Sequence, residues 1–219
     1  MKRKLWNIAR VYVGIAVGLS IMLWAFAEEP EWKLPAPKKK GKISLEEALS
    51  LRQSSKEGFS NKELTEKEIG QILWAARGVN RPNGKLTSPS AMARYSVSVY
   101  VATNKGTFLY ISKNHSLSPI DHKDIRRGVG TQVHMQTAPV ILIFVADFSK
   151  LPEDFTMDRK ISLVCAEAGT IGENVYLQCA ALKLGTCFVA SVEKDFVKTA
   201  LNFGKDIEPL FAMPIGHPK

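Results

Sequence analysis

The chain has 219 residues, of which 45% are hydrophobic, and this is ample for one well-packed domain. Its formal net charge is +9, but no run of basic residues is interleaved with aromatic residues, so the composition argues against nucleic-acid binding. The cysteines and the four histidines share no ligand spacing, which argues against a disulfide framework or a zinc site: Cys165, Cys179, Cys187, His115, His122, His134 and His217.

The first 27 residues have the layout of a secretory signal peptide. A positively charged start precedes an uncharged apolar run at residues 11–27, which ends in the small-x-small pattern Ala25-Phe26-Ala27. The run is close to the minimum length for a membrane span, so an uncleaved anchor is the alternative. In either case the positive flank stays in the cytoplasm, and we expect the remainder to be exported to an extracytoplasmic space such as the periplasm.

Residues 28–42 are rich in proline and lysine and are predicted to form a linker without structure of its own. The folded domain is then expected at residues 43–219. A capping box at residues 44–47 predicts a first helix, and a second at residues 65–68 predicts an amphipathic helix that ends before Gly78.

Strands are predicted from alternating or continuous apolar residues. Residues 97–111 read as a hairpin with a turn at residues 104–106. Residues 138–146 are apolar throughout, which predicts a strand covered on both faces. Two further strands are expected at residues 186–190 and 210–215.

A long helix is predicted at residues 158–183, where apolar residues recur at helical spacing without a proline. Its length would be about 39 Å, and the small residues in its middle suit the close approach of another backbone, as in a dimer interface. We expect Gly185 to end it and a short helix to follow at residues 194–201. Residues 121–136 are compatible with a helix, which Gly128 and Gly130 disfavour.

The stretch that follows the first helix carries the clearest chemical signal. Arg52, Ser54 and Lys56 place a guanidinium, a hydroxyl and an ammonium group at alternate positions. Because alternate residues of an extended segment point the same way, the three donors would face one ligand, which should be anionic or rich in acceptors. A solvated basic turn is the alternative interpretation.

Taken together, these elements resemble the nitroreductase superfamily of flavoproteins, and more closely its SagB/ThcOx branch of thiazole and oxazole dehydrogenases. The resemblance covers residues 43–219 and rests on a set of short motifs in the correct order and spacing. These motifs are Ser44 to Leu49 leading into Arg52, Ser54 and Lys56, then Ile72 to Gly78, Ser88 to Ala91, Ala168 to Gln178, Leu184 to Thr186, and Pro214 to Pro218.

The resemblance implies an α+β, nitroreductase-like fold, with a mixed central sheet flanked by helices and a long central helix. It also implies a homodimer that binds FMN at its interface, is reduced by NAD(P)H or another donor, and passes electrons to a small organic acceptor. An azoline dehydrogenase that oxidises peptide heterocycles is one alternative, and an exported flavin-binding module without catalysis is another. The redox chemistry belongs to the flavin, so no catalytic acid or nucleophile is expected from the protein.

The family motifs assign roles to nine residues of this chain. Arg52 and Ser54 would hold the FMN phosphate and ribityl chain, and Lys56 would lie near the N1/O2 edge, where a cation stabilises the reduced ring. Two triplets would lie against the ring, and the second would offer a backbone N–H to flavin N5: Pro89, Ser90 and Ala91, and Val189, Ala190 and Ser191.

Overall fold

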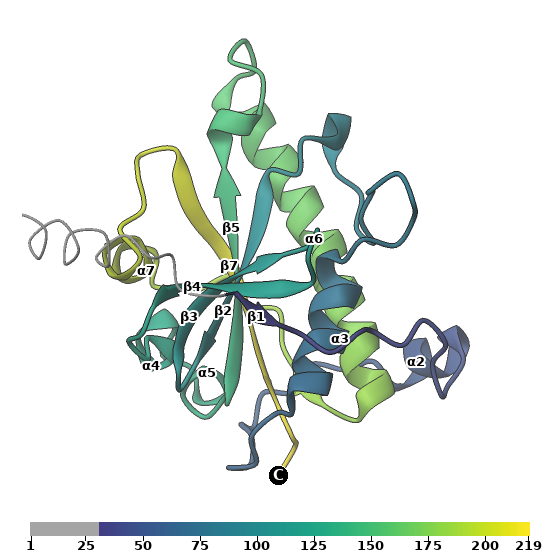
Figure 1. The fold of residues 1–219 in the computed structure, drawn as a ribbon. Coiled ribbons are helices and arrows are strands. Elements are labelled where there is room, and N and C mark those ends of the chain that lie inside the picture. The colour runs from purple at the N-terminus through teal and green to yellow at the C-terminus, as the bar shows by residue number, and fades with distance from the viewer. Residues whose placement is uncertain (1–30) are drawn as a thin grey trace, which may run out of the picture. The chain divides into compact units, whose positions relative to one another are not determined.

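The computed structural model describes residues 31–219, so the signal peptide or anchor predicted for residues 1–27 lies outside the described residues. Within residues 31–219, no helix is both long and apolar enough to cross a membrane. The centre of the fold is an antiparallel sheet (Figure 1). In sheet order its strands are β1 (Trp32–Lys33), β4 (Ser116–Asp121), β3 (Gly106–Ile111), β2 (Val97–Thr103), β5 (Val140–Asp147), β7 (Ile207–Gly216) and β6 (Gly185–Thr186).

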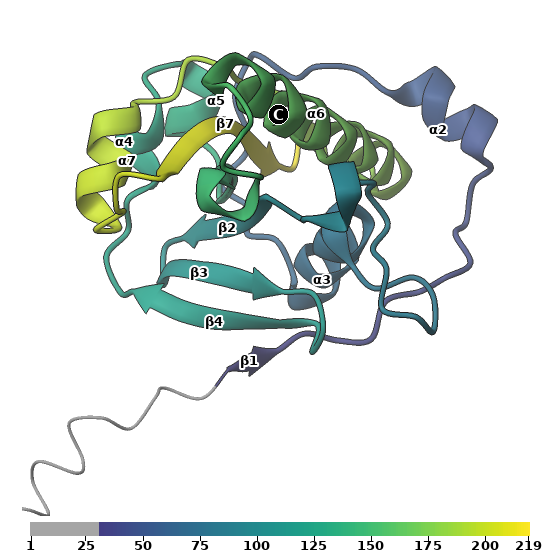
Figure 2. The ribbon, with the colours of Figure 1, turned by 90° about the horizontal axis from the view of Figure 1, so that it is seen from above.

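Helices cover both faces of this sheet (Figure 2). On one face lie α3 (Glu66–Arg77) and α6 (Met157–Leu182), and on the other lie α4 (Arg126–Val129), α5 (Val133–Gln136) and α7 (Lys194–Ala200). The helix α2 (Leu45–Leu51) stands beyond α6, away from the sheet. Two hydrophobic cores result, one on each face.

Strand β5 separates the two cores, and its sequence explains how. Leu142, Phe144 and Ala146 pack into the core under α3 and α6. Their alternate neighbours face the core under α7: Ile141, Ile143 and Val145. All six are buried, so the prediction of a strand covered on both faces is confirmed. The hairpin is confirmed as well, since β2 and β3 pair around Asn104 and Lys105.

The long helix is confirmed as α6, which has 26 residues. It begins after Thr156, whose side chain accepts a hydrogen bond from the Arg159 N–H. The prediction that Gly185 ends it is wrong. Lys183 takes the left-handed conformation at φ 57° that caps the helix, whereas Gly185 lies in β6. A buried stripe faces the sheet, and its members are Val164, Ala168, Ile171, Val175 and Cys179.

Two predictions need correction. Residues 121–136 do not form one helix, because β4 continues to Asp121 and Gly130 is extended (φ −169°, ψ 160°) between the four-residue helices α4 and α5. The segment predicted as an unstructured linker carries β1, whose two residues pair with β4 and form the edge of the sheet. The folded unit therefore starts at Glu31 rather than at residue 43.

The predicted strand at residues 186–190 is shorter than expected. Only Gly185–Thr186 pairs as β6, and the chain rejoins the sheet at Val189 through a bridge to Ala212 of β7. The predicted last strand is longer, since β7 spans Ile207–Gly216, and the predicted short helix is confirmed as α7. Between β6 and Val189 the chain passes close to α6, which matters for the site.

Candidate functional site

The segment after α2 runs beside β6 and contacts α6. Arg52 is extended (φ −61°, ψ 121°), and its guanidinium carbon lies 5.3 Å from the centroid of the Tyr176 ring. The Ser54 Oγ lies 2.8 Å from the hydroxyl oxygen of the same tyrosine. Next in the chain, the Ser55 N–H donates to the Thr186 carbonyl at 2.8 Å. Arg52 and Ser54 therefore meet one residue of α6, while Ser55 bonds to the edge of the sheet.

The two cations of this segment are available to a ligand. Arg52 is half-buried and Lys56 is exposed. Neither side chain makes a hydrogen bond or ion pair with any other residue in the range 31–219. A pocket of about 320 Å³ adjoins the segment. It is lined by the alternate residues Gln53 and Ser55, together with Tyr176, and not by Arg52, Ser54 or Lys56. Arg52 and Lys56 are therefore chemically suited to hold an anion, because their charges are not used within the described residues.

The proton of Tyr176 sets the direction of its contact with Ser54. The backbone N–H of Phe188 donates to the Tyr176 hydroxyl at 2.7 Å, so this oxygen is already an acceptor. The phenol is buried and has one proton to donate. Among the described residues, Ser54 Oγ is the acceptor within reach of that proton. With Tyr176 assigned as the donor on this accounting, the proton of Ser54 is free for a ligand.

The third predicted group, residues 189–191, directly follows Phe188, whose N–H donates to Tyr176. Val189 exchanges two backbone hydrogen bonds with Ala212, at 2.8 and 2.9 Å, directly after Phe188. Ala190 and Ser191 are exposed, and Ser191 Oγ accepts a hydrogen bond from the Gln132 side chain at 2.6 Å. Tyr176 thus connects the segment at residues 52–56 with the segment at residues 188–191.

The second group, residues 89–91, has different surroundings. Ser90 Oγ donates to Glu167 of α6 at 2.6 Å, and Glu167 forms a buried ion pair with Arg77 of α3. Both charged side chains are almost fully enclosed, with 3% of Glu167 and 5% of Arg77 exposed. Burial lowers the pKa of Arg77, and the adjacent Glu167 carboxylate opposes that shift. Pro89 is exposed and Ala91 is half-buried.

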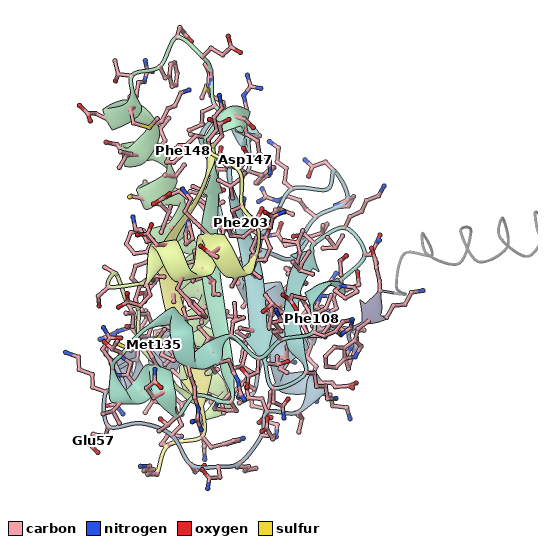
Figure 3. All side chains as sticks on the ribbon, turned by 90° about the vertical axis from the view of Figure 1, so that its left-hand side faces the viewer. Glu57, Phe108, Met135, Asp147, Phe148 and Phe203 are labelled. Carbon is pink, nitrogen blue, oxygen red and sulfur yellow. The ribbon has the colours of Figure 1, made fainter. Side chains whose placement is uncertain are left out.

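One chain does not bring all three groups together. Tyr176 and Glu167 are nine residues apart on α6, which corresponds to about 13.5 Å along the axis and about half a turn around it. They flank the buried stripe of α6 on opposite sides. The two groups also lie at opposite ends of the sheet. The Asp147 N–H donates to the Ser96 carbonyl, near residues 89–91, whereas Glu57, next to Lys56, lies at the other end (Figure 3).

Sequence reasoning missed three of the residues that organise this region. Glu167 is a single acid beside the apolar stripe of α6, and a charge in that position is a usable signal of a buried pair. Arg77 resembles an ordinary basic residue at a helix C-terminus, so its burial was not visible. Tyr176 resembles a core aromatic residue, and only the folded chain places its hydroxyl between Ser54 and Phe188.

Comparison with known proteins identifies the family. The family model described as the nitroreductase family matches residues 49–217. A protein of Methanocaldococcus jannaschii that carries the nitroreductase name is 31% identical over 184 residues, covering 80% of this chain and 91% of that protein.

Two solved structures show the same fold. A crystal structure from Ralstonia eutropha, also described as a nitroreductase, is 30% identical with a TM-score of 0.81, covering 88% of this chain and 91% of that one. The NADPH:FMN oxidoreductase of Vibrio harveyi, solved as a complex with NAD⁺, is 18% identical with a TM-score of 0.59, covering 80% of this chain and 69% of that one. The expected nitroreductase-like fold is thereby confirmed, and the chain belongs to the nitroreductase family.

Proposed function

We propose that this protein is an FMN-dependent oxidoreductase that takes electrons from NAD(P)H and passes them to a small organic acceptor. The observation that carries the proposal is the set of free donors at Arg52, Ser54 and Lys56 in a chain that belongs to the nitroreductase family. The Vibrio harveyi relative supports the cofactor, because that protein is an NADPH:FMN oxidoreductase in complex with NAD⁺.

The residues present fit such a cofactor. Arg52 can hold a phosphate with two parallel hydrogen bonds, and Ser54 adds a hydroxyl donor that Tyr176 leaves free. Lys56 supplies an unpaired positive charge two residues further on, which would favour negative charge on a reduced ring. When bound, FMN would supply the redox chemistry, so the chain's own residues need only bind, orient and stabilise charge.

We further propose that the active form is a homodimer, in which residues 89–91 of one copy meet residues 52–56 of the other. The half-turn between Tyr176 and Glu167 supports this, because a single chain holds the two groups on opposite sides of α6. The apolar stripe of α6 also continues past the core, where Met157 is 55% and Ile161 is 42% exposed. A Cβ atom added at Gly169 would meet nothing within 4 Å, so a second backbone has room to approach there.

The function is tested by adding FMN to the purified full-length chain under anaerobic conditions. We expect a flavin absorption band that stays with the protein on gel filtration and bleaches when NADH or NADPH is added. Recovery of the band with a quinone or nitroaromatic would complete the reaction. A bound flavin that is indifferent to nicotinamides would overturn the proposed donor and favour azoline oxidation, and failure to take up FMN would overturn the function itself.

The site is tested by Arg52→Ala and Lys56→Ala, measured by the FMN dissociation constant. Loss of a hydrogen bond to a charged partner is worth about 1.5–3 kcal/mol, so each variant should bind FMN roughly 10 to 150-fold more weakly. Arg127→Ala is the matched control, since Arg127 is an exposed arginine on α4, across the sheet from Tyr176. Unchanged affinity in both site variants would exclude this assignment.

We also propose that the protein acts outside the cytoplasm, as the start of the sequence predicts. Cell fractionation of the producing organism should find the full-length chain, or its cleaved form, in the membrane or extracytoplasmic fraction. Removal of residues 1–27 should move it to the cytoplasmic fraction, and an unchanged distribution would contradict the proposal.

A further inference from the structure

Both carboxylate oxygens of Glu167 accept hydrogen bonds from neighbouring residues. Its Oε1 accepts hydrogen bonds from the Arg77 guanidinium and, at 3.1 Å, from the Val97 backbone N–H. Its Oε2 lies 2.6 Å from Ser90 Oγ. An ionised carboxylate can only accept, so the short contact with Ser90 requires that the serine donates.

Ser90 therefore has no proton left for a ligand. Its single hydroxyl proton goes to Glu167, and one of its two lone pairs accepts the Tyr95 backbone N–H at 2.8 Å. What remains is one lone pair. Any molecule placed against Ser90 meets an acceptor and no hydroxyl donor, which is the reverse of Ser54.

The loop around Ser90 is held in an unusual shape by the same partners. Met92, Ala93 and Tyr95 all have φ between 50° and 52°, a left-handed conformation that costs non-glycine residues free energy. The Arg77 guanidinium carbon lies 5.1 Å from the centroid of the Tyr95 ring, and Arg77 also donates to Ser88 at 3.3 Å. The Arg77–Glu167 pair thus fixes both ends of residues 88–95.

We propose that Glu167 is a positioning residue that keeps Ser90 as a hydrogen-bond acceptor, so that residues 89–91 offer no hydroxyl donor to the flavin. This inference rests on the proposed function, because it takes FMN as the ligand and residues 89–91 as part of its site. The physical consequence is a lower reduction potential, since a ring that gains negative charge would be stabilised by a donor at this position.

Glu167→Gln reverses the polarity of Ser90 while keeping the shape of the side chain. The new amide oxygen must occupy the Oε1 position, where Arg77 and Val97 both donate, so the NH₂ group faces Ser90. Ser90 would then accept from both this NH₂ group and the Tyr95 N–H, and its own proton would be released toward the ligand.

The test is the midpoint potential of FMN bound to the full-length protein, followed by its absorbance in a redox titration. We expect Glu167→Gln to raise the potential above that of the wild type. Ser90→Ala should not raise it, and the double variant of the two should match Ser90→Ala. Ser88→Ala is the control, because it removes the contact to Arg77 without touching Ser90.

Glu167→Gln leaves Arg77 as a buried charge without a countercharge, so a second variant is needed in case this one does not fold. Arg77→Met combined with Glu167→Gln removes that charge and keeps the reversed contact to Ser90, and it should show the same rise. A rise that persists without Ser90, or no rise in either variant, would overturn the inference alone. Failure of the wild type to take up FMN would overturn the proposed function and this inference together.

Discussion

Two serines of this chain form hydrogen bonds with buried side chains of one helix, and the two bonds run in opposite directions. We assign Tyr176 as the donor to Ser54, because the tyrosine oxygen already accepts a backbone N–H and its own proton has no other partner among the described residues. Ser90 donates a hydrogen bond to Glu167, because an ionised carboxylate can only accept. Toward a ligand, Ser54 is therefore a hydrogen-bond donor and Ser90 is an acceptor. The role of each serine toward a ligand depends on whether its protein partner has a proton to donate.

The two regions also differ in how strongly they are tied to the fold. The Ser90 region depends on an enclosed ion pair that joins α3, α6 and the start of β2. The Ser54 region depends on one neutral hydroxyl and on two cations that have no hydrogen-bond or ion-pair partner among residues 31–219. We therefore expect mutations in the first region to act mainly on stability and those in the second mainly on ligand binding.

The largest effect is expected for Glu167→Ala. It leaves the Arg77 charge buried and unpaired, which typically costs about 3–5 kcal/mol in the free energy of unfolding. Urea unfolding followed by circular dichroism would measure it. Glu208→Ala is the control, since Glu208 pairs with Lys198 at 3.0 Å on the surface and should contribute no more than about 1 kcal/mol. Equal losses in the two variants would refute the contrast.

A smaller loss is expected for Tyr176→Phe. The ring is kept, but the Phe188 N–H loses its acceptor, which costs about 1–3 kcal/mol when the group stays buried. Ser54 loses its partner in the same change, so FMN affinity should fall too, although by less than in Arg52→Ala. Tyr100→Phe serves as the control, because no hydrogen bond joins the Tyr100 hydroxyl to another described residue. A neutral Tyr176→Phe variant would contradict the role assigned to this hydroxyl.

The smallest effect is expected from pH, and it should leave both serine regions unaffected. His115 ties Tyr110 to the Pro35 carbonyl, at 2.8 and 3.1 Å, and burial lowers the pKa of His115 below its usual 6.5. The unfolded chain therefore binds more protons just below pH 6.5, so stability is fully present above that pH and declines as pH falls toward the folded pKa. Melting temperatures between pH 5 and 8 should show this decline, and His115→Gln should remove it. A decline of equal size in that variant would assign it to another group.

Much of the architecture could be predicted from the sequence. The continuous apolar run at residues 138–146 and the 3.6-residue repeat of α6 correctly indicated the buried strand and the long helix, because both signals lie in the pattern of neighbouring residues. Short elements were missed because they have too few residues to show a pattern. The two residues of β1 form a strand only because β4 presents an open edge, and Lys183 ends α6 in a conformation that a local pattern assigns to glycine.

By itself, the sequence determined the order of the elements, the family motifs and the alternation of Arg52, Ser54 and Lys56, since each is written in neighbouring residues. Only the tertiary structure decided that Tyr176 and Glu167 meet the two serines from opposite sides of α6. Hydrogen-bond direction depends on every donor and acceptor around an atom. Here those atoms come from segments separated by 77 residues in one case and 122 in the other, a distance that no local pattern encodes.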